Sequence, residues 1–283
     1  MTSVPADSAG AMRPPHTSSL SELAAIVELT EGAAYADLLC AAPAEWGCVA
    51  EESSCGWLLM APPLDMLLFN RLVGCGVREP APPTQLQALL ARFRERGLRN
   101  FGVQLSPAAL PSDLPMQLES QGLAIRDRWT KVHRGPGTPS MRETAVSVEQ
   151  IGFERAAAFA ELTTIGFGMP AQLRPWIAST VGRSGWRHYV ASLDGTPIAA
   201  AALFVDGSVG WLGVASTLPQ ARRHGAQGAL FARRIADASA MGCSHVITET
   251  SEELPNRPNP SFRNMLRAGF AVVYHRPNYM LAV

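Results

Sequence analysis

Residues 212–230 read Leu-Gly-Val-Ala-Ser-Thr-Leu-Pro-Gln-Ala-Arg-Arg-His-Gly-Ala-Gln-Gly-Ala-Leu, and this stretch indicates how the second half of the chain folds. An apolar strand is expected to end at Ala215, and a short loop with Arg222, Arg223 and Gly225 leads into a helix. The first N–H groups of a helix lack partners within it, and the helix dipole makes this end electropositive. Glycine lets the backbone approach an anion, and arginines add charge-assisted hydrogen bonds. The sequence therefore predicts an anion-binding loop between a strand and a helix.

The spacing Arg222-x-x-Gly225-x-Gln227 resembles the loop Q/R-x-x-G-x-G/A with which the GNAT superfamily of N-acetyltransferases holds the pyrophosphate of coenzyme A. Gln227 departs from the family pattern, which has a small residue there. Two later stretches are also similar to the family in order and residue type: a strand at Cys243–Glu249, and a short helix within Asn259–Phe270 that is closed by Gly-Phe.

This resemblance implies an enzyme that moves an acetyl group from acetyl-CoA to the amine of a small-molecule or amino-acid-like acceptor by direct attack in a ternary complex. It places the cofactor against the strand end, the loop and the later short helix. The implied cofactor-binding residues are Leu212, Gly213, Val214, Ala215, Arg222, Arg223, His224, Gly225, Ala226, Gln227 and Asn264.

Acetyl transfer also requires the amine to lose a proton, which a positioned carboxylate accepts. Glu249, at the end of its predicted strand, is the first candidate for this base, and an exposed strand-end carboxylate is the alternative interpretation. Many family members have a tyrosine as proton donor where this chain has Met265, which cannot donate a proton. Ser261 and Asn264 are the candidates to hydrogen-bond the sulfur or the pantetheine arm, and Ser261 is the predicted catalytic residue beside Glu249. Tyr274 and Tyr279 are the alternative proton donors, although a strand tyrosine also fits half-buried packing, and departure of the thiolate with the assistance of water stays open.

The family places a loop between its first two helices over the acceptor. Here that loop is Phe167-Gly168-Met169-Pro170, with Trp176 after it. An apolar, aromatic cover suits a small, partly hydrophobic amine. Phe167, Met169 and Trp176 are therefore the predicted acceptor-binding residues, although each also fits a role in the core.

Composition narrows the function classes. Lys plus Arg and Asp plus Glu number 24 each, which argues against binding to nucleic acid or an anionic membrane. The five cysteines form no CxxC pair, so reduced thiols are expected, with no disulfide framework or metal site. The most apolar region, Trp57–Phe69, is interrupted by Pro62-Pro63 and Asp65 and does not fit a membrane span. Without a signal-peptide pattern, a cytoplasmic protein is expected.

Length and turn residues predict the domain organisation. A chain of 283 residues suits two domains, and Arg134–Ser140 bunches two Gly and two Pro as a linker would. The turn dipeptides Asp194-Gly195 and Asp206-Gly207 separate three predicted antiparallel strands at 188–193, 197–205 and 208–215. Helices are expected at 148–165 and 171–181. We expect a disordered tail at 1–19, a first domain at 20–134, a linker at 135–141 and an acetyl-CoA-binding GNAT domain at 142–283.

The first domain repeats the outline of the second in weaker form. A strand is expected at 66–77, followed by a helix closed by Gly97, a strand at 101–104 and a short helix before Leu123. It has no counterpart of Arg222-x-x-Gly225, which predicts a degenerate copy without coenzyme A binding. The predicted fold class is α/β: two tandem GNAT-like domains, each a central mixed β-sheet flanked by helices. An unrelated α/β first domain is the alternative.

Two other functions stay open at this stage. A non-catalytic acyl-CoA-binding regulatory protein would keep the loop and lose turnover, and Met265 favours it. An interaction module would not bind coenzyme A. The acceptor, the acyl chain length and the oligomeric state are not predicted.

Overall fold

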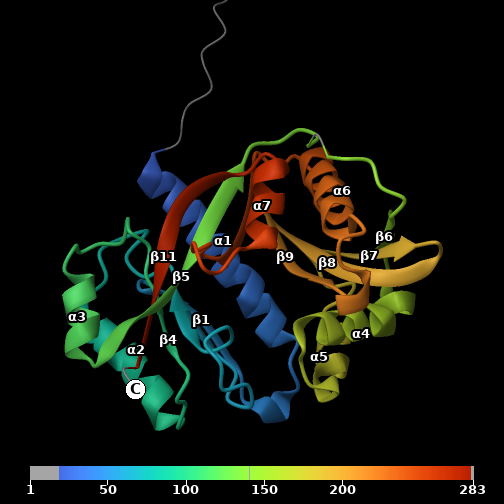
Figure 1. Ribbon diagram of the computed structural model, residues 1–283. Coiled ribbons are helices and arrows are strands. Elements are labelled where there is room, and N and C mark those ends of the chain that lie inside the picture. The colour runs from blue at the N-terminus through green and yellow to red at the C-terminus, as the bar shows by residue number, and fades with distance from the viewer. Residues whose placement is uncertain (1–18, 140, 282–283) are drawn as a thin grey trace, which may run out of the picture.

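The computed structural model describes residues 19–139 and 141–281, so most of the predicted N-terminal tail, with Ser140, lies outside the described residues. Its centre is one eleven-stranded sheet with the order β1-β2-β3-β4-β11-β5-β10-β9-β8-β7-β6 (Figure 1). The strands are β1 (Val49–Ser53), β2 (Gly56–Met60), β3 (Arg71–Val73), β4 (Gly102–Gln104), β5 (Leu123–Arg134), β6 (Ser147–Ile151), β7 (Trp186–Leu193), β8 (Thr196–Asp206), β9 (Val209–Thr217), β10 (His245–Ser251) and β11 (Ala271–Leu281). The α-helices are α1 (Leu20–Cys40), α2 (Pro83–Glu95), α3 (Leu114–Ser120), α4 (Ala156–Phe167), α5 (Arg174–Ser179), α6 (Ala226–Ala240) and α7 (Pro260–Arg267).

Two segments of the chain follow the same order of elements. The first runs β1-β2-β3-α2-β4-α3-β5 and the second runs β7-β8-β9-α6-β10-α7-β11. In each, the strands on either side of the crossover helix are parallel, β3 with β4 and β9 with β10, and the other pairs in the sheet are antiparallel. The internal similarity predicted from sequence is therefore present in the topology.

The expectation of one separate sheet per domain is wrong, because the two segments exchange their last strands. β5 pairs with β10 of the second segment, and β11 pairs with β4 of the first. β5 and β11 also pair with each other along nearly their whole length. Main-chain hydrogen bonds thus continue through the middle of the molecule and join both segments in one sheet.

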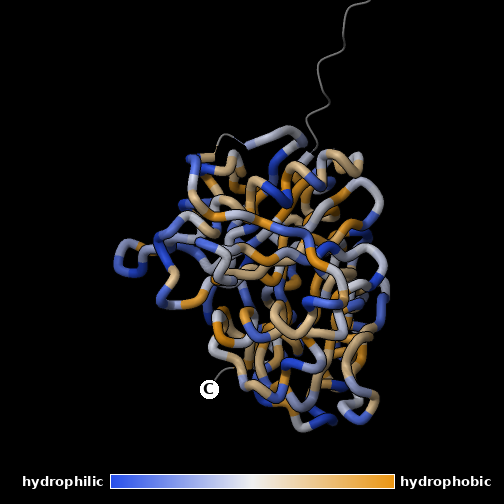
Figure 2. Tube along the Cα trace, turned by 90° about the vertical axis from the view of Figure 1, so that its right-hand side faces the viewer, coloured by the Kyte–Doolittle hydropathy of each residue, from blue (hydrophilic) through white to orange (hydrophobic). Residues whose placement is uncertain are grey.

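Helices cover both faces of this sheet. Side chains alternate between the faces along a strand, and in β8 Ala200, Ala202 and Phe204 pack with α1, α4 and α5. Ala199, Ala201 and Leu203 pack with α6 and α7 on the other face. On this same face, α2 and α3 cover the strands of the first segment. α1 runs diagonally across the centre of its face (Figure 1). Figure 2 shows the apolar stretches inside and the hydrophilic loops at the periphery.

The local predictions are confirmed in part. The three strands at 188–215, the helix after the basic loop and the short helix before Gly269 are present as β7, β8, β9, α6 and α7. The helix expected from 148 begins only at Ala156, because residues 147–151 pair with the open edge of β7 as β6. The strand expected at 66–77 is reduced to β3. Its first residues form a turn held by Asn70, whose side chain bonds the Ala61 N–H and the Leu64 carbonyl.

A buried ion cluster fixes α1 to the sheet. Glu28 and Glu31 of α1 are fully buried, as are Arg71 of β3, Lys131 of β5 and Arg276 of β11. Arg276 Nη1 lies 2.6 Å from Glu28 and 2.7 Å from Glu31, and Arg71 Nη1 lies 3.0 Å from Glu31. Lys131 also bonds Glu31. These ion pairs connect one helix to three strands, two of which are the exchanged ones.

Among residues 19–139 and 141–281, no helix has the length and apolar character needed to cross a bilayer.

We predict that Glu31→Gln will lower the free energy of unfolding by about 3–5 kcal/mol, because it leaves buried cations without their counter-charge. Burial of the Glu31 carboxyl opposes its ionisation, but Arg276, Lys131 and Arg71 outweigh burial and hold the pKa of Glu31 well below its usual range. This stabilisation is present above the unfolded-state pKa of about 4.3 and is lost as the pH falls toward the folded-state pKa. Urea unfolding from pH 7 down to pH 3 measures both effects.

Glu45→Gln is the matched control, because Glu45 is exposed in the short turn after α1. It should change stability by less than about 0.5 kcal/mol. Equal stability of Glu31→Gln and the parent chain at pH 7 would contradict the prediction.

Candidate active site

The site begins where β9 and β10 separate. The two strands pair in parallel only at His245↔Val209, Val246↔Gly210 and Ile247↔Trp211. Both strands then continue, and the Thr248 hydroxyl donates to the Leu212 carbonyl at 2.7 Å across the start of the gap. Beyond this point, the main-chain N–H and C=O groups on the β10 side of β9 are not paired with another strand among the described residues. The two strands therefore splay apart after residue 212.

β9 also carries a bulge in this gap. Its pairing with β8 shifts register between Ala200 and Ala202, opposite Gly213 and Ser216. Val214, within the bulge, has a φ of +50°, which is unusual for a β-branched residue. Bulges and positive φ values concentrate at functional sites, where they redirect the backbone.

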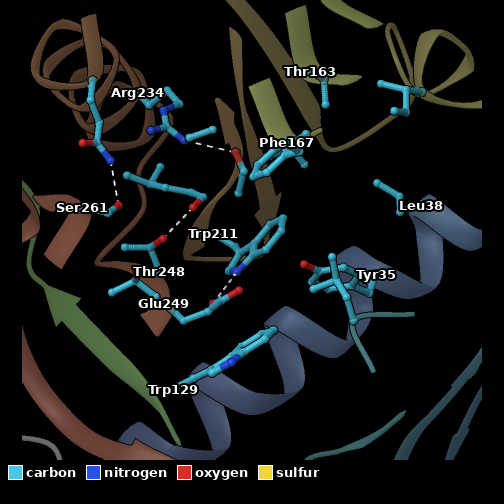
Figure 3. Close-up of a pocket in the computed structure, with 18 of the residues that line it drawn as sticks. Tyr35, Leu38, Trp129, Thr163, Phe167, Trp211, Arg234, Thr248, Glu249 and Ser261 are labelled. Atoms are coloured by element: carbon cyan, nitrogen blue, oxygen red, sulfur yellow. Dashed lines mark hydrogen bonds between the residues drawn. The ribbon is translucent and has the colours of Figure 1, made fainter. Parts of the chain in front are cut away.

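A cavity of about 340 Å³ opens at the splay (Figure 3). Its wall on the α6 and α7 side includes Gln227, Phe231, Arg234, Ser261 and Met265. Its wall on the opposite face of the sheet comes from α1, α4, α5 and the loop between β2 and β3. The cavity thus reaches both faces through the gap between the strands. The residues of β9 and β10 that line it are Trp211, Leu212, Gly213, Val214, Ala215, Thr248, Glu249, Thr250 and Ser251.

Glu249 lies at the centre of the wall, with only 10% of its side chain exposed. Its carboxylate accepts a hydrogen bond from Trp211 Nε1 at 3.1 Å (Figure 3). It also accepts one from Lys131 Nζ at 3.1 Å. The Trp211 side chain reaches the Glu249 carboxylate by lying along β9 over Gly213. A Cβ atom at position 213 would be 1.9 Å from the nearest atom of the Trp211 ring. The carboxylate is therefore oriented by two donors.

The basic loop forms an open helix N-terminus. Gly225 is the N-cap of α6 with a φ of +88°, and no side chain of the described residues caps this helix. Arg223 also has a positive φ, +72°, and Arg222, Arg223 and His224 are exposed. A Cβ on Gly225 would lie 2.6 Å from Thr144 Oγ1, which donates to the His224 carbonyl. The free N–H groups of the first α6 turn and two arginines therefore face the solvent together.

Residues 167–247 match the family model described as an acetyltransferase (GNAT) domain. This region belongs to the GNAT acetyltransferase superfamily. No curated protein matches the chain.

Solved structures share the fold over most of the chain. A GCN5-related N-acetyltransferase from Kribbella flavida is 19% identical, with a TM-score of 0.55 over 77% of this chain and 84% of that one. A conserved protein of unknown function from Staphylococcus epidermidis is 9% identical, with a TM-score of 0.56 over 82% and 93%. A tandem GNAT protein from the clavulanic acid biosynthesis pathway is 18% identical, with a TM-score of 0.50 over 68% of each chain. At these identities the likeness shows a shared fold.

In this GNAT region, Gln227 connects α6 to α7. Its Nε2 donates to Ser261 Oγ at 2.7 Å, and its Oε1 accepts from the Asn264 side chain. The large side chain therefore turns toward α7 and leaves the loop open. Ser261 lines the cavity, and its own O–H remains able to donate. Asn264 is not among the lining residues and contacts Gln227 and Arg267 instead.

The two tyrosines considered as proton donors lie elsewhere. The Tyr274 hydroxyl donates to Glu28 at 2.7 Å within the ion cluster, and Tyr279 packs in the core beneath α2 and α3. Neither lines the cavity, whereas Met265 does. The structure therefore gives no support to either tyrosine as the proton donor.

All three residues predicted to bind the acceptor line the cavity: Phe167, Met169 and Trp176. Trp176 is also buried in the core, where its Nε1 donates to the Leu38 carbonyl at 2.9 Å. Trp176 therefore packs in the core, and its position in the cavity wall also fits its predicted role in binding the acceptor. The cofactor-binding and catalytic roles of the other predicted residues stay predictions.

The first segment supplies part of the wall, through residues that the sequence analysis did not name. Tyr35 of α1 faces the cavity, with its ring 5.4 Å from that of Trp211. Burial is the main reason that the pKa of Tyr35 is raised, and Glu249 adds to it while Arg71 opposes it, so the phenol stays protonated. No local motif marks these positions; the one available signal is the presence of Glu28 and Glu31 in the mostly apolar stretch 23–36 of α1. The residues of the first segment that line the cavity are Tyr35, Leu38, Leu68, Phe69 and Trp129.

We predict that Gly225→Ala will lower the free energy of unfolding by at least about 1–2 kcal/mol, the cost of left-handed backbone for an L-residue. The clash of its Cβ with Thr144 adds to this cost. Gly228→Ala is the control, because Gly228 lies inside α6 and its Cβ would meet only the mobile end of Met141. Helix propensity favours that change by up to about 1 kcal/mol. Thermal unfolding compares the two, and similar midpoints would contradict the prediction.

Proposed function

We propose that this protein is an N-acetyltransferase that moves the acetyl group of acetyl-CoA to a small, partly hydrophobic amine. The observation that carries the proposal is the continuity of the site. The open, basic helix N-terminus at Gly225 continues into α6, whose Gln227 and Phe231 line the cavity at the splayed end of β9. Among the described residues that line this cavity, Glu249 is the one carboxylate, and two donors orient it.

The residues present fit coenzyme A. The first-turn N–H groups of α6, with Arg222 and Arg223, would hold the pyrophosphate beside Gly225, whose left-handed backbone favours glycine. The main chain of residues 212–215 would bind the pantetheine arm and the thioester oxygen, the arrangement of preorganised donors that stabilises charge in acyl transfer. When bound, acetyl-CoA supplies the acetyl group as a reactive thioester.

Proton transfer falls to the chain's own residues. Glu249 accepts the proton of the acceptor amine, and Lys131 and Trp211 hold its carboxylate in place. Tyr35 takes the role of proton donor that Met265 cannot fill, and Ser261 hydrogen-bonds the sulfur or the pantetheine. Residues 20–134 act as a degenerate copy that forms part of the acceptor wall, and residues 142–283 carry the cofactor contacts.

A non-catalytic acyl-CoA-binding protein is the second candidate. Met265 at the position of the usual proton donor and the ion pair of Glu249 with Lys131 favour it. Tight coenzyme A binding without turnover of any amine would support this candidate over the enzyme.

We predict that Arg222→Ala will weaken acetyl-CoA binding by about 1.5–3 kcal/mol, the value of a hydrogen bond to a charged group. Gly225→Asp should abolish binding, because it places a carboxylate against the phosphates. Isothermal titration calorimetry measures both, with Arg99→Ala, an exposed arginine before β4, as the control. Unchanged affinity in a folded Gly225→Asp variant would rule out this cofactor site.

We predict that Glu249→Gln will lower kcat by about 10²–10⁴, the usual contribution of a positioned base. Acetyl-CoA affinity should stay within twofold, and the loss should shrink at high pH, where more amine is already neutral. Release of free thiol from acetyl-CoA with a panel of aliphatic and aromatic amines gives the rates.

Glu252→Gln is the matched control, because Glu252 lies outside the cavity, near His275. Tyr35→Phe should lower kcat and leave acetyl-CoA affinity unchanged. Parent-like rates of Glu249→Gln across the pH range would exclude Glu249 as the base.

A further inference from the structure

Arg234 of α6 is a fully buried cation without a carboxylate partner among the described residues. Its Nε donates to the Leu230 carbonyl at 3.1 Å, and its Nη1 donates to the Ala202 and Gly213 carbonyls at 3.0 and 3.3 Å. Its Nη2 has no hydrogen-bond partner. Arg234 also lines the cavity, directly beneath the bulge of β9 (Figure 3).

The nearest acidic side chain on the same helix does not neutralise it. Asp237 is bound by Arg233 at 2.9 Å and accepts from the Tyr189 hydroxyl at 2.8 Å. Burial lowers the pKa of Arg234 to about 10, which still leaves it charged at neutral pH. A buried guanidinium that meets only carbonyl dipoles is costly, and an apolar side chain of similar size would avoid the cost. Arg234 lines the cavity and its buried Nη2 lacks an acceptor, which a ligand with a negatively charged oxygen would supply.

The position of Arg234 identifies which part of the ligand carries that oxygen. It lies nine residues after Gly225, which is about 13 Å along the helix from the proposed pyrophosphate site. It also lies on the α6 and α7 face, whereas the predicted acceptor residues come from the opposite face. The pantetheine arm proposed to lie at residues 212–215 carries no charge, so a negatively charged oxygen beside the bulge belongs to the acyl chain.

We infer that the acyl subsite accepts a short acyl group that ends in a second carboxylate, the monothioester of a dicarboxylic acid, and that Arg234 binds this carboxylate. Phe231 and Met265 give the methylene chain an apolar wall next to the guanidinium. Acetyl-CoA is then a smaller donor that leaves Arg234 unpaired. This inference rests on the proposed use of acyl-CoA.

The test compares succinyl-CoA with butyryl-CoA, which has the same number of acyl carbons and no carboxylate. Isothermal titration calorimetry without an acceptor measures the affinity of the full chain for both and for free coenzyme A. We expect at least tenfold tighter binding of succinyl-CoA. Arg234→Met should remove this preference and keep the affinity for free coenzyme A within twofold, and Arg233→Met should leave the preference intact.

Equal affinities of the parent chain for the two thioesters, with free coenzyme A bound, would overturn this inference alone. A preference that persists in Arg234→Met would also overturn it. If Arg234→Met does not fold, the affinities for the two thioesters in the parent chain and in Arg234→Lys, which keeps the charge, still test the inference. Failure of all three ligands to bind would overturn the proposed function as well.

Discussion

The buried ion cluster is the constraint on which the rest of this structure depends. Glu28 and Glu31 of α1 meet Arg71, Lys131 and Arg276 away from water, so each charge is acceptable only while the others are in place. The three cations come from β3, β5 and β11, and a shift of any of these strands would expose an unpaired charge. The cluster therefore fixes the position of α1 and the register of the exchanged strands together.

The same cluster reaches the candidate active site. Lys131 contacts both Glu31 and Glu249, so the third carboxylate balances the third cation. In consequence a lysine of the first segment orients the proposed base of the second. Because of the strand exchange, both segments contribute residues to the site. These side chains keep fixed distances from one another because they are attached to one continuous sheet.

At the splay, interrupted β pairing supplies the polar groups that a site needs. The bulge at Val214 leaves the Gly213 carbonyl to Arg234, and the separation of β9 from β10 leaves the Leu212 carbonyl to Thr248. Side chains from helix and strand thus satisfy the carbonyls that the sheet no longer pairs. Among the described residues, the first-turn N–H groups of α6 have no side-chain cap, and the buried Arg234 Nη2 has no hydrogen-bond partner.

The sequence by itself determined the features that depend on neighbouring residues. The hairpin dipeptides predicted β7, β8 and β9, and the Arg222-to-Gly225 loop predicted the open helix start and the GNAT relationship, because turn and cap preferences act within a few residues. Glu249 was placed at the cavity from its position at the end of a strand.

Only the tertiary structure decided the strand exchange and the contributions of Tyr35, Lys131 and Arg234. Each depends on which distant strand fills a sheet position or which helix lies beneath it. No local pattern encodes these choices, because β5 and β11 are both long strands with similar pairing capacity. In the observed arrangement, Lys131 of β5 and Arg276 of β11 both pair with the buried glutamates of α1.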